Sequence, residues 1–132
     1  MAFVRVSGFS QTDIDTAYNN GYAAGRTSAS PSRKSFYFDL SSGATYSDSW
    51  TAPKSGTLNI YWNDACGGGS NGWSLTVGGS YVINRGTSDM DRERNKVQFT
   101  TASVTAGQTI SISAHSDSGW YCKGTVYIIL TV

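Results

Sequence analysis

The chain has 132 residues and a formal net charge of +1, and 14% of its residues are charged, 39% hydrophobic and 13% aromatic. A soluble domain ordinarily carries about 25% charged residues, so uncharged serine, threonine and glycine supply much of the polarity here and a glutamate-rich helical bundle is disfavoured. The near-neutral charge gives no field that would draw the chain onto nucleic acid, and the aromatic content excludes a disordered linker.

The first residues, Met-Ala-Phe-Val-Arg-Val-Ser, lack the basic region and unbroken apolar stretch of a secretory signal. No run in the chain approaches the roughly 18 apolar residues that a membrane helix needs. We therefore expect no signal peptide and no membrane insertion. An extracellular role would then need another route, such as release of assembled particles when a host cell lyses, and the alternative is a protein that stays in the cytoplasm.

Only the stretch Ser10–Arg26 has a helical period, with Ile14, Tyr18 and Tyr22 on one face. A helix of this length with an internal glycine is unstable in isolation, so it needs a partner. That partner is either the rest of the chain or identical helices around a symmetry axis, in which case these three residues are the oligomerisation contacts. We expect two parts, an attachment or oligomerisation segment at 1–30 and a β domain at 31–132, joined by a serine-rich linker.

From Ser35 onward apolar residues alternate with polar ones, as in Phe36, Phe38 and Leu40, which predicts half-buried strands. The segment Val126–Leu130 is apolar on both faces and should be central in a sheet or at a subunit contact. About eight strands without helical crossovers predict an all-β fold, an antiparallel β-sandwich of jelly-roll type with a short N-terminal helix. The other predicted strands include Thr45–Thr51, Leu58–Trp62, Trp73–Val77, Ser80–Asn84, Val97–Phe99 and Ile110–Ile112.

The two cysteines, Cys66 and Cys122, form no Cys-x-x-Cys pair and have no histidine at ligand spacing, so no structural zinc site is expected. None of the functions considered below calls for a cofactor. They can form one disulfide with each other. The alternative, favoured by the missing signal peptide, is two reduced thiols packed as small apolar side chains.

Candidate catalytic groups are few, and each has a plainer explanation. His115 is the only histidine and no serine lies in a Gly-x-Ser-x-Gly motif, which favours a loop histidine over a triad. Asp89, Asp91 and Glu93 resemble a glycosidase pair or a calcium loop, but the arginines between them favour a solvated loop or an ion-pair network between identical chains. The run Gly67–Gly72 does not lead into a helix and is expected to form a turn, not a phosphate loop. We therefore expect that the protein is not an enzyme.

Aromatic rings beside amide and carboxylate side chains are what a sugar-binding surface needs, because apolar sugar faces stack on rings while polar groups hold the hydroxyls. The residues predicted to form such a surface, for a glycan or another host-surface ligand, are Trp73, Trp120, Tyr121, Asn71 and Asp117. In the competing interpretation the large rings of the domain fill the sandwich and its subunit contacts, and Trp73 and Trp120 are the two expected to stay on the surface. These rings are Tyr46, Trp50, Trp62, Trp73, Trp120 and Tyr121.

Three segments carry a resemblance to a known class of protein. Tyr46–Ile60, an aromatic residue followed by Ala-Pro, a glycine and a strand, resembles the β-sandwich modules of phage tail and head fibres, and a similar pattern opens a strand in trimeric heads of the tumour-necrosis-factor type. Val104–Ile110 is similar to a turn and strand of the same modules. Ala17–Gly25 resembles a helix that precedes phage fibre heads.

This resemblance implies a phage virion protein, a homotrimeric fibre, spike or decoration head made in the host cytoplasm and located in the virion. The N-terminal segment would bind other virion proteins, and the sandwich would contact a glycan or protein of the host surface. The alternative is a carbohydrate-binding module or lectin without a virion role, whose sugar binding would be lost in Trp73→Ala or Trp120→Ala. A third hypothesis is a hydrolase that uses Asp89, Asp91 and Glu93.

Overall fold

The structure, a computed structural model, describes residues 32–94 and 96–132. The helix predicted over Ser10–Arg26 and its residues Ile14, Tyr18 and Tyr22 lie outside this range. A 3-10 turn, η2 (Thr87–Asp89), follows the fifth strand, and the described part has no helix long and apolar enough to cross a membrane. The strands are β1 (Ser32–Ser41), β2 (Thr45–Thr51), β3 (Gly56–Cys66), β4 (Gly72–Val77), β5 (Ser80–Gly86), β6 (Gln98–Val104), β7 (Thr109–His115) and β8 (Tyr121–Thr131).

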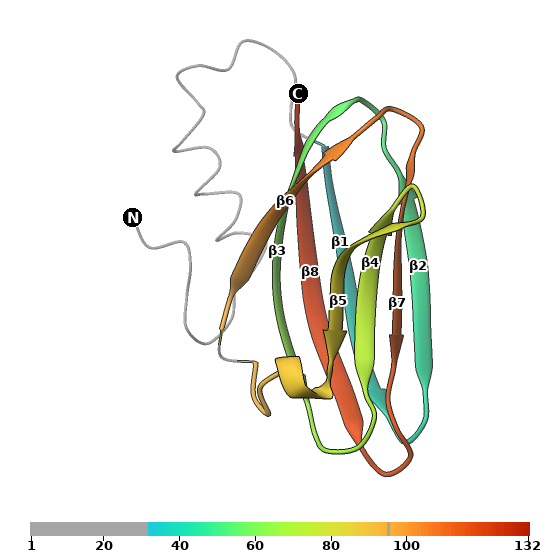
Figure 1. Cartoon of the computed structure of the whole chain (residues 1–132), viewed down its shortest axis with the longest axis vertical. Coiled ribbons are helices and arrows are strands. Elements are labelled where there is room, and N and C mark those ends of the chain that lie inside the picture. The colour runs from blue at the N-terminus through green and yellow to red at the C-terminus, as the bar shows by residue number, and fades with distance from the viewer. Residues whose placement is uncertain (1–31, 95) are drawn as a thin grey trace.

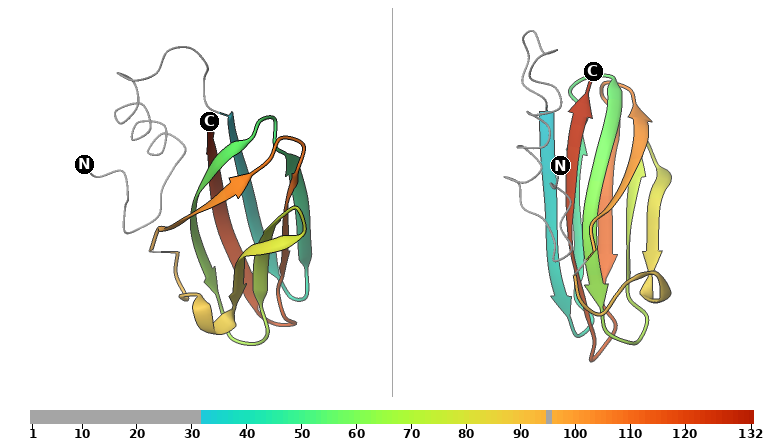
Figure 2. Two further views of the ribbon diagram at one scale, coloured as in Figure 1. Left: turned by 45° about the horizontal axis from the view of Figure 1, so that its top comes forward. Right: turned by 90° about the vertical axis from the view of Figure 1, so that its left-hand side faces the viewer.

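The eight strands form two antiparallel sheets that pack face to face (Figures 1 and 2). One sheet has the order β1-β8-β3-β6 and the other β2-β7-β4-β5. The first strand pairs with the last, the second with the seventh, the third with the sixth and the fourth with the fifth. This nested pairing, divided between two sheets, is the arrangement of a jelly roll and confirms the predicted fold class.

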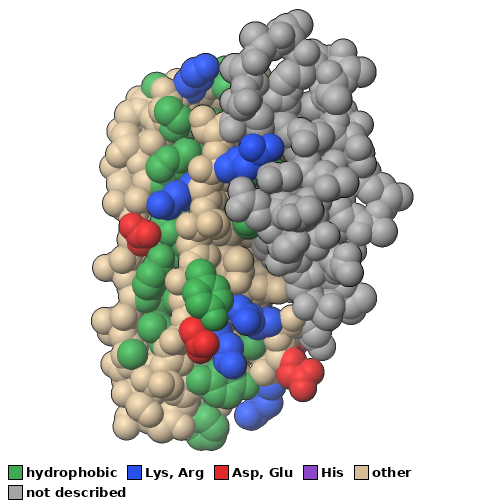
Figure 3. All heavy atoms as spheres, turned by 180° about the vertical axis from the view of Figure 1, so that it is seen from behind, with side chains coloured by type: hydrophobic (Ala, Val, Ile, Leu, Met, Phe, Trp, Pro, Cys, Tyr) green, Lys and Arg blue, Asp and Glu red, His purple; other side chains and the backbone are tan. Residues whose placement is uncertain are grey.

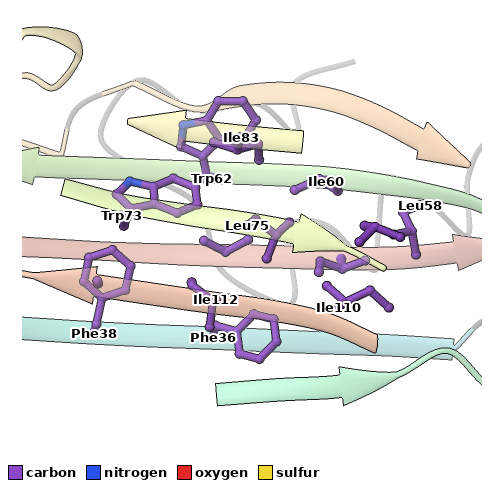
Figure 4. Packing of buried hydrophobic residues seen from close by; sticks show 14 of the residues in the cluster. Phe36, Phe38, Leu58, Ile60, Trp62, Trp73, Leu75, Ile83, Ile110 and Ile112 are labelled. Carbon is purple, nitrogen blue, oxygen red and sulfur yellow. The ribbon is translucent and has the colours of Figure 1, made fainter. Parts of the chain in front are cut away.

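The sandwich interior is filled by the alternating apolar side chains that the sequence predicts (Figure 4). In β1, Phe36, Phe38 and Leu40 are buried while Tyr37 and Asp39 face outward, because successive side chains of a strand point to opposite sides. Strand β8 lies between β1 and β3, which is one of the two places that its apolar character on both faces predicts. The largest fully buried side chains are Phe36, Phe38, Leu58, Ile60, Leu75, Ile110, Ile112, Val126, Ile128, Ile129 and Leu130.

The connections gather at the two ends of the sandwich. At the end opposite the C-terminus lie the β1–β2 turn, the β3–β4 loop, the β7–β8 loop and η2 (Figure 1). The β4–β5 hairpin turns through Gly78 and Gly79, whose φ angles of 58° and 86° match the two-residue turn that favours glycine. On the part of the face in Figure 3 that grey atoms do not cover, both acidic and basic side chains lie among apolar ones.

Candidate functional site

Two loops at the end opposite the C-terminus are fastened to each other by buried Asn71. Its side-chain amide donates to the Gly68 carbonyl at 2.6 Å, and its Oδ1 accepts the backbone N–H of Asp117 at 2.8 Å. Asp117 returns the contact, since its Oδ2 accepts the N–H of Ser70 at 2.9 Å. The β3–β4 and β7–β8 loops are therefore a single hydrogen-bonded unit, which holds any side chain they carry in a fixed place.

The indole of Trp120 lies against the glycines of the β3–β4 loop. A Cβ atom added at Gly67, Gly68 or Gly69 would lie 2.7, 2.9 or 2.4 Å from an atom of the indole, so any larger residue would have to displace the ring. The residue nevertheless stays 41% exposed. The three glycines thus allow the tryptophan to rest on backbone while part of its surface faces solvent.

The carboxylate of Asp117 lies beside this ring. A Cβ atom at Gly69 would contact both Asp117 Oδ2 and Trp120 Nε1, at 2.7 and 2.8 Å, so carboxylate and indole border the same small space. Hydrogen bonds from the backbone N–H groups of Ser70 and Ser118 hold the pKa of Asp117 below its ordinary value. Each oxygen accepts one of these bonds and keeps a lone pair for a ligand hydroxyl.

A third segment joins the unit through Thr87 and Tyr121. The Thr87 hydroxyl donates to the Gly69 carbonyl at 2.8 Å and accepts the N–H of Asn71 at 2.8 Å. The Tyr121 hydroxyl donates to the carbonyl of Arg92 at 2.7 Å, and its ring faces the ammonium of Lys123 at 5.2 Å. The segment after β5 is in this way held against the β3–β4 loop and the start of β8.

Beneath the loops a buried carboxylate that is not among the predicted site residues connects the two sheets. Asp64 accepts the indole N–H of Trp73 at 2.7 Å and two bonds from the guanidinium of Arg85, at 2.9 and 3.1 Å. The same guanidinium lies over the ring of Trp62, whose indole is edge-on to Trp73. The signal was present in the sequence: Asp64 shares the inward parity of Leu58 and Trp62, and a buried charge needs a partner.

The structure brings four of the five predicted ligand-binding residues to one end of the molecule but gives them different roles. Trp120 and Asp117 are accessible, whereas Asn71 is buried and positions the loops, and Tyr121 is half-buried with its hydroxyl engaged. The predicted place of Trp73 on the ligand-binding surface is wrong. This residue is only 2% exposed, so its ring fills the core and cannot stack on a ligand.

The other candidate groups do not converge. Asp89 Oδ2 accepts the N–H of Gly86, Asp91 pairs with the exposed Lys96 at 3.7 Å, and Glu93 and His115 are exposed. In the described residues no group of three His, Cys, Asp or Glu could hold a metal ion.

No protein-family model matches the sequence, and neither does any curated protein. Among solved structures, the chain is similar to a family 35 carbohydrate-binding module from Clostridium thermocellum, with 15% identity over 75% of this chain and 98% of that one and a TM-score of 0.44. A family 35 module from Paenibacillus barcinonensis is 11% identical over 70% of this chain and 74% of that one, with a TM-score of 0.40. Dimeric latent PorU from Porphyromonas gingivalis is 10% identical over 76% of this chain but 13% of its own length, with a TM-score of 0.46.

These likenesses concern the strand arrangement alone. The predicted phage virion function is wrong on this comparison, because the similar structures include carbohydrate-binding modules and show no relationship to phage tail fibres. The short segments that resembled fibre modules reflect turn and strand chemistry that many β-sandwiches share: an Ala-Pro turn before a strand needs only a proline and a glycine.

Proposed function

We propose that this protein is a carbohydrate-binding module whose site is formed by Trp120 and Asp117. The observation that carries the proposal is Trp120, a residue that is 41% exposed and whose indole lies against three glycines beside a carboxylate with free lone pairs. An apolar sugar face can stack on such a ring while the carboxylate accepts hydroxyl hydrogen bonds. Because the loops are already fastened to each other, little ordering is needed on binding.

The site is small and open, so we expect weak binding of a neutral or basic sugar, with a Kd in the micromolar to millimolar range. An acidic sugar would have to place its carboxylate beside that of Asp117, and two neighbouring negative charges repel each other. Neutral polysaccharides are therefore the first ligands to test.

The test is binding to a panel of immobilised polysaccharides and arrayed glycans, followed by calorimetric titration of any ligand found. Trp120→Ala should raise the Kd at least about tenfold, the equivalent of 1.4 kcal/mol. The matched control is Tyr81→Ala, which removes another exposed aromatic ring, 68% accessible, beside the β4–β5 turn. Equal loss in both variants, unchanged binding in Trp120→Ala, or no binding by the wild type across the panel would overturn the proposal.

A further inference from the structure

The two cysteines lie directly opposite each other on neighbouring strands. Cys66 is the last residue of β3 and Cys122 the second of β8, and their Cα atoms are register partners. Both residues belong to the core between the sheets and are 2% and 0% exposed, and neither is in a disulfide in this structure, where the Cys66 thiol donates to the Thr87 carbonyl at 3.7 Å. They therefore point to the same side of the same sheet.

The backbone hydrogen bonds show whether Cys66 and Cys122 are a hydrogen-bonded or a non-hydrogen-bonded pair of the antiparallel ladder. The N–H of Gly67 donates to the carbonyl of Tyr121 at 3.1 Å, so Gly67 and Tyr121 are a hydrogen-bonded pair. Hydrogen-bonded and non-hydrogen-bonded pairs alternate along an antiparallel ladder, which makes Cys66 and Cys122 a non-hydrogen-bonded pair. In agreement, the backbone N–H of Cys66 points away from β8 and donates to the backbone carbonyl of Asp91 at 3.0 Å.

Pairs of this kind have Cα atoms about 4.5 Å apart, which is inside the roughly 4.4–6.8 Å that a disulfide spans. We propose that Cys66 and Cys122 form a reversible cross-strand disulfide that fastens the base of the β3–β4 and β7–β8 loops. Cys66 directly precedes the glycines under Trp120, and Cys122 follows Trp120 by two residues. The bond would join the two chain segments that Asn71 and Asp117 already hold together by hydrogen bonds.

The oxidant that the step needs is a small-molecule disulfide, such as oxidised glutathione. One cysteine thiolate attacks a sulfur of that disulfide, whose S–S bond breaks and releases one glutathione thiolate. The second cysteine thiolate then attacks the protein sulfur of the mixed disulfide and releases the second glutathione. Overall the two cysteines lose two electrons and two protons, and both are recovered in two reduced glutathione molecules.

Burial controls how fast this occurs. It raises the pKa of the Cys66 thiol above its ordinary value and that of Cys122 to about 12, so little thiolate is present in the folded protein. The bond should therefore form while the chain folds or when the ends of β3 and β8 open, and form slowly in the folded state.

The experiment uses the whole chain, denatured and refolded in buffers with either oxidised and reduced glutathione or excess reductant. We expect the oxidised sample to lose both titratable thiols and to yield a single peptide pair linked through Cys66 and Cys122. Its midpoint of thermal unfolding should lie roughly 5–15 °C above that of the reduced sample.

Cys66→Ala and Cys122→Ala are the controls, and neither should change its midpoint between the two buffers. Because the thiol count is made on the wild type, the test does not depend on either variant folding. Two free thiols after refolding in the oxidising buffer, or a lower midpoint in the disulfide form, would overturn the proposal. Neither result bears on sugar binding, so this inference stands apart from the proposed function.

Discussion

The carboxylate of Asp64 shows how a single residue can link both sheets of the sandwich. It lies on β3, only 5% exposed, and accepts hydrogen bonds from Trp73 on β4 and Arg85 on β5. A buried ion pair is often no more stable than an apolar replacement of the whole pair, but loss of one partner leaves a buried charge without compensation. The stability of the protein should therefore be sensitive to Arg85.

Arg85→Met keeps much of the arginine stem and removes the charge. We expect the free energy of unfolding to fall by about 3 kcal/mol, because Asp64 would retain only the Trp73 indole as a partner. Urea unfolding measures the change. The control is Lys96→Met, which breaks the exposed pair with Asp91 and should cost less than about 0.5 kcal/mol. Similar losses in both variants would contradict this account of the buried pair.

The raised pKa of the Cys122 thiol, about 12 because of its burial, predicts a loss of stability in alkali. As pH rises from the ordinary thiol pKa of 9.0 toward 12, the unfolded chain releases this proton and the folded protein keeps it. The free energy of unfolding of the reduced protein should then fall by up to about 1.4 kcal/mol per pH unit in that window, and this group contributes no pH dependence below it. Cys122→Ala should have a shallower slope in denaturation curves between pH 9 and 11, and an unchanged slope would refute the assignment.

At the scale of elements, the alternation of apolar and polar residues was the sequence pattern that predicted the strands most reliably. It predicted several of the eight strands, and the run that is apolar on both faces predicted that β8 is central in a sheet or at a subunit contact, of which the structure shows the first. It could also have placed Trp73, because in β4 that residue has the same parity as the buried Leu75 and Val77. The error came from assigning a ring to a surface by its polar sequence neighbours. Which loops meet at one end depends on strand pairing, and a local pattern does not encode pairing between distant strands.

The Gly67–Gly69 segment is the element on which the candidate site depends. At Gly69, φ is 79° and a Cβ atom would lie 2.4 Å from the Trp120 ring. Gly69→Ala should therefore add backbone strain of about 1 kcal/mol or more and also displace the indole. We expect a shift of the tryptophan emission maximum and weaker sugar binding.

Gly79→Ala is a matched control for this prediction. Gly79 has a similar φ of 86° in the β4–β5 turn, but an added Cβ atom there would meet nothing within 4 Å. It should carry the backbone strain without changing tryptophan emission. If both variants alter the emission equally, backbone strain alone explains the effect and the contact with Trp120 is not its cause.

For the whole molecule, the nested pairing makes the two ends of the described chain depend on each other. Strand β1 pairs along its length with β8, and its side chains Phe36, Phe38 and Leu40 complete one side of the core. Of the four nested pairs only β4–β5 is a tight hairpin, so most of the sandwich relies on contacts distant in sequence. Folds of this kind form slowly and gain stability only when the distant strands have met.

A pair of truncations tests whether the sandwich is complete without the residues before β1. A chain that begins at residue 32 keeps every strand and the whole buried cluster, so we expect cooperative thermal unfolding and dispersed amide resonances. A chain that begins at residue 43 loses β1, and with it three large buried side chains worth about 2–5 kcal/mol each, against a total stability of about 5–15 kcal/mol. It should be unfolded. Cooperative unfolding of the shorter chain would show that β1 is dispensable, whereas loss of folding in the longer one would place part of the stabilising contacts outside the described sandwich.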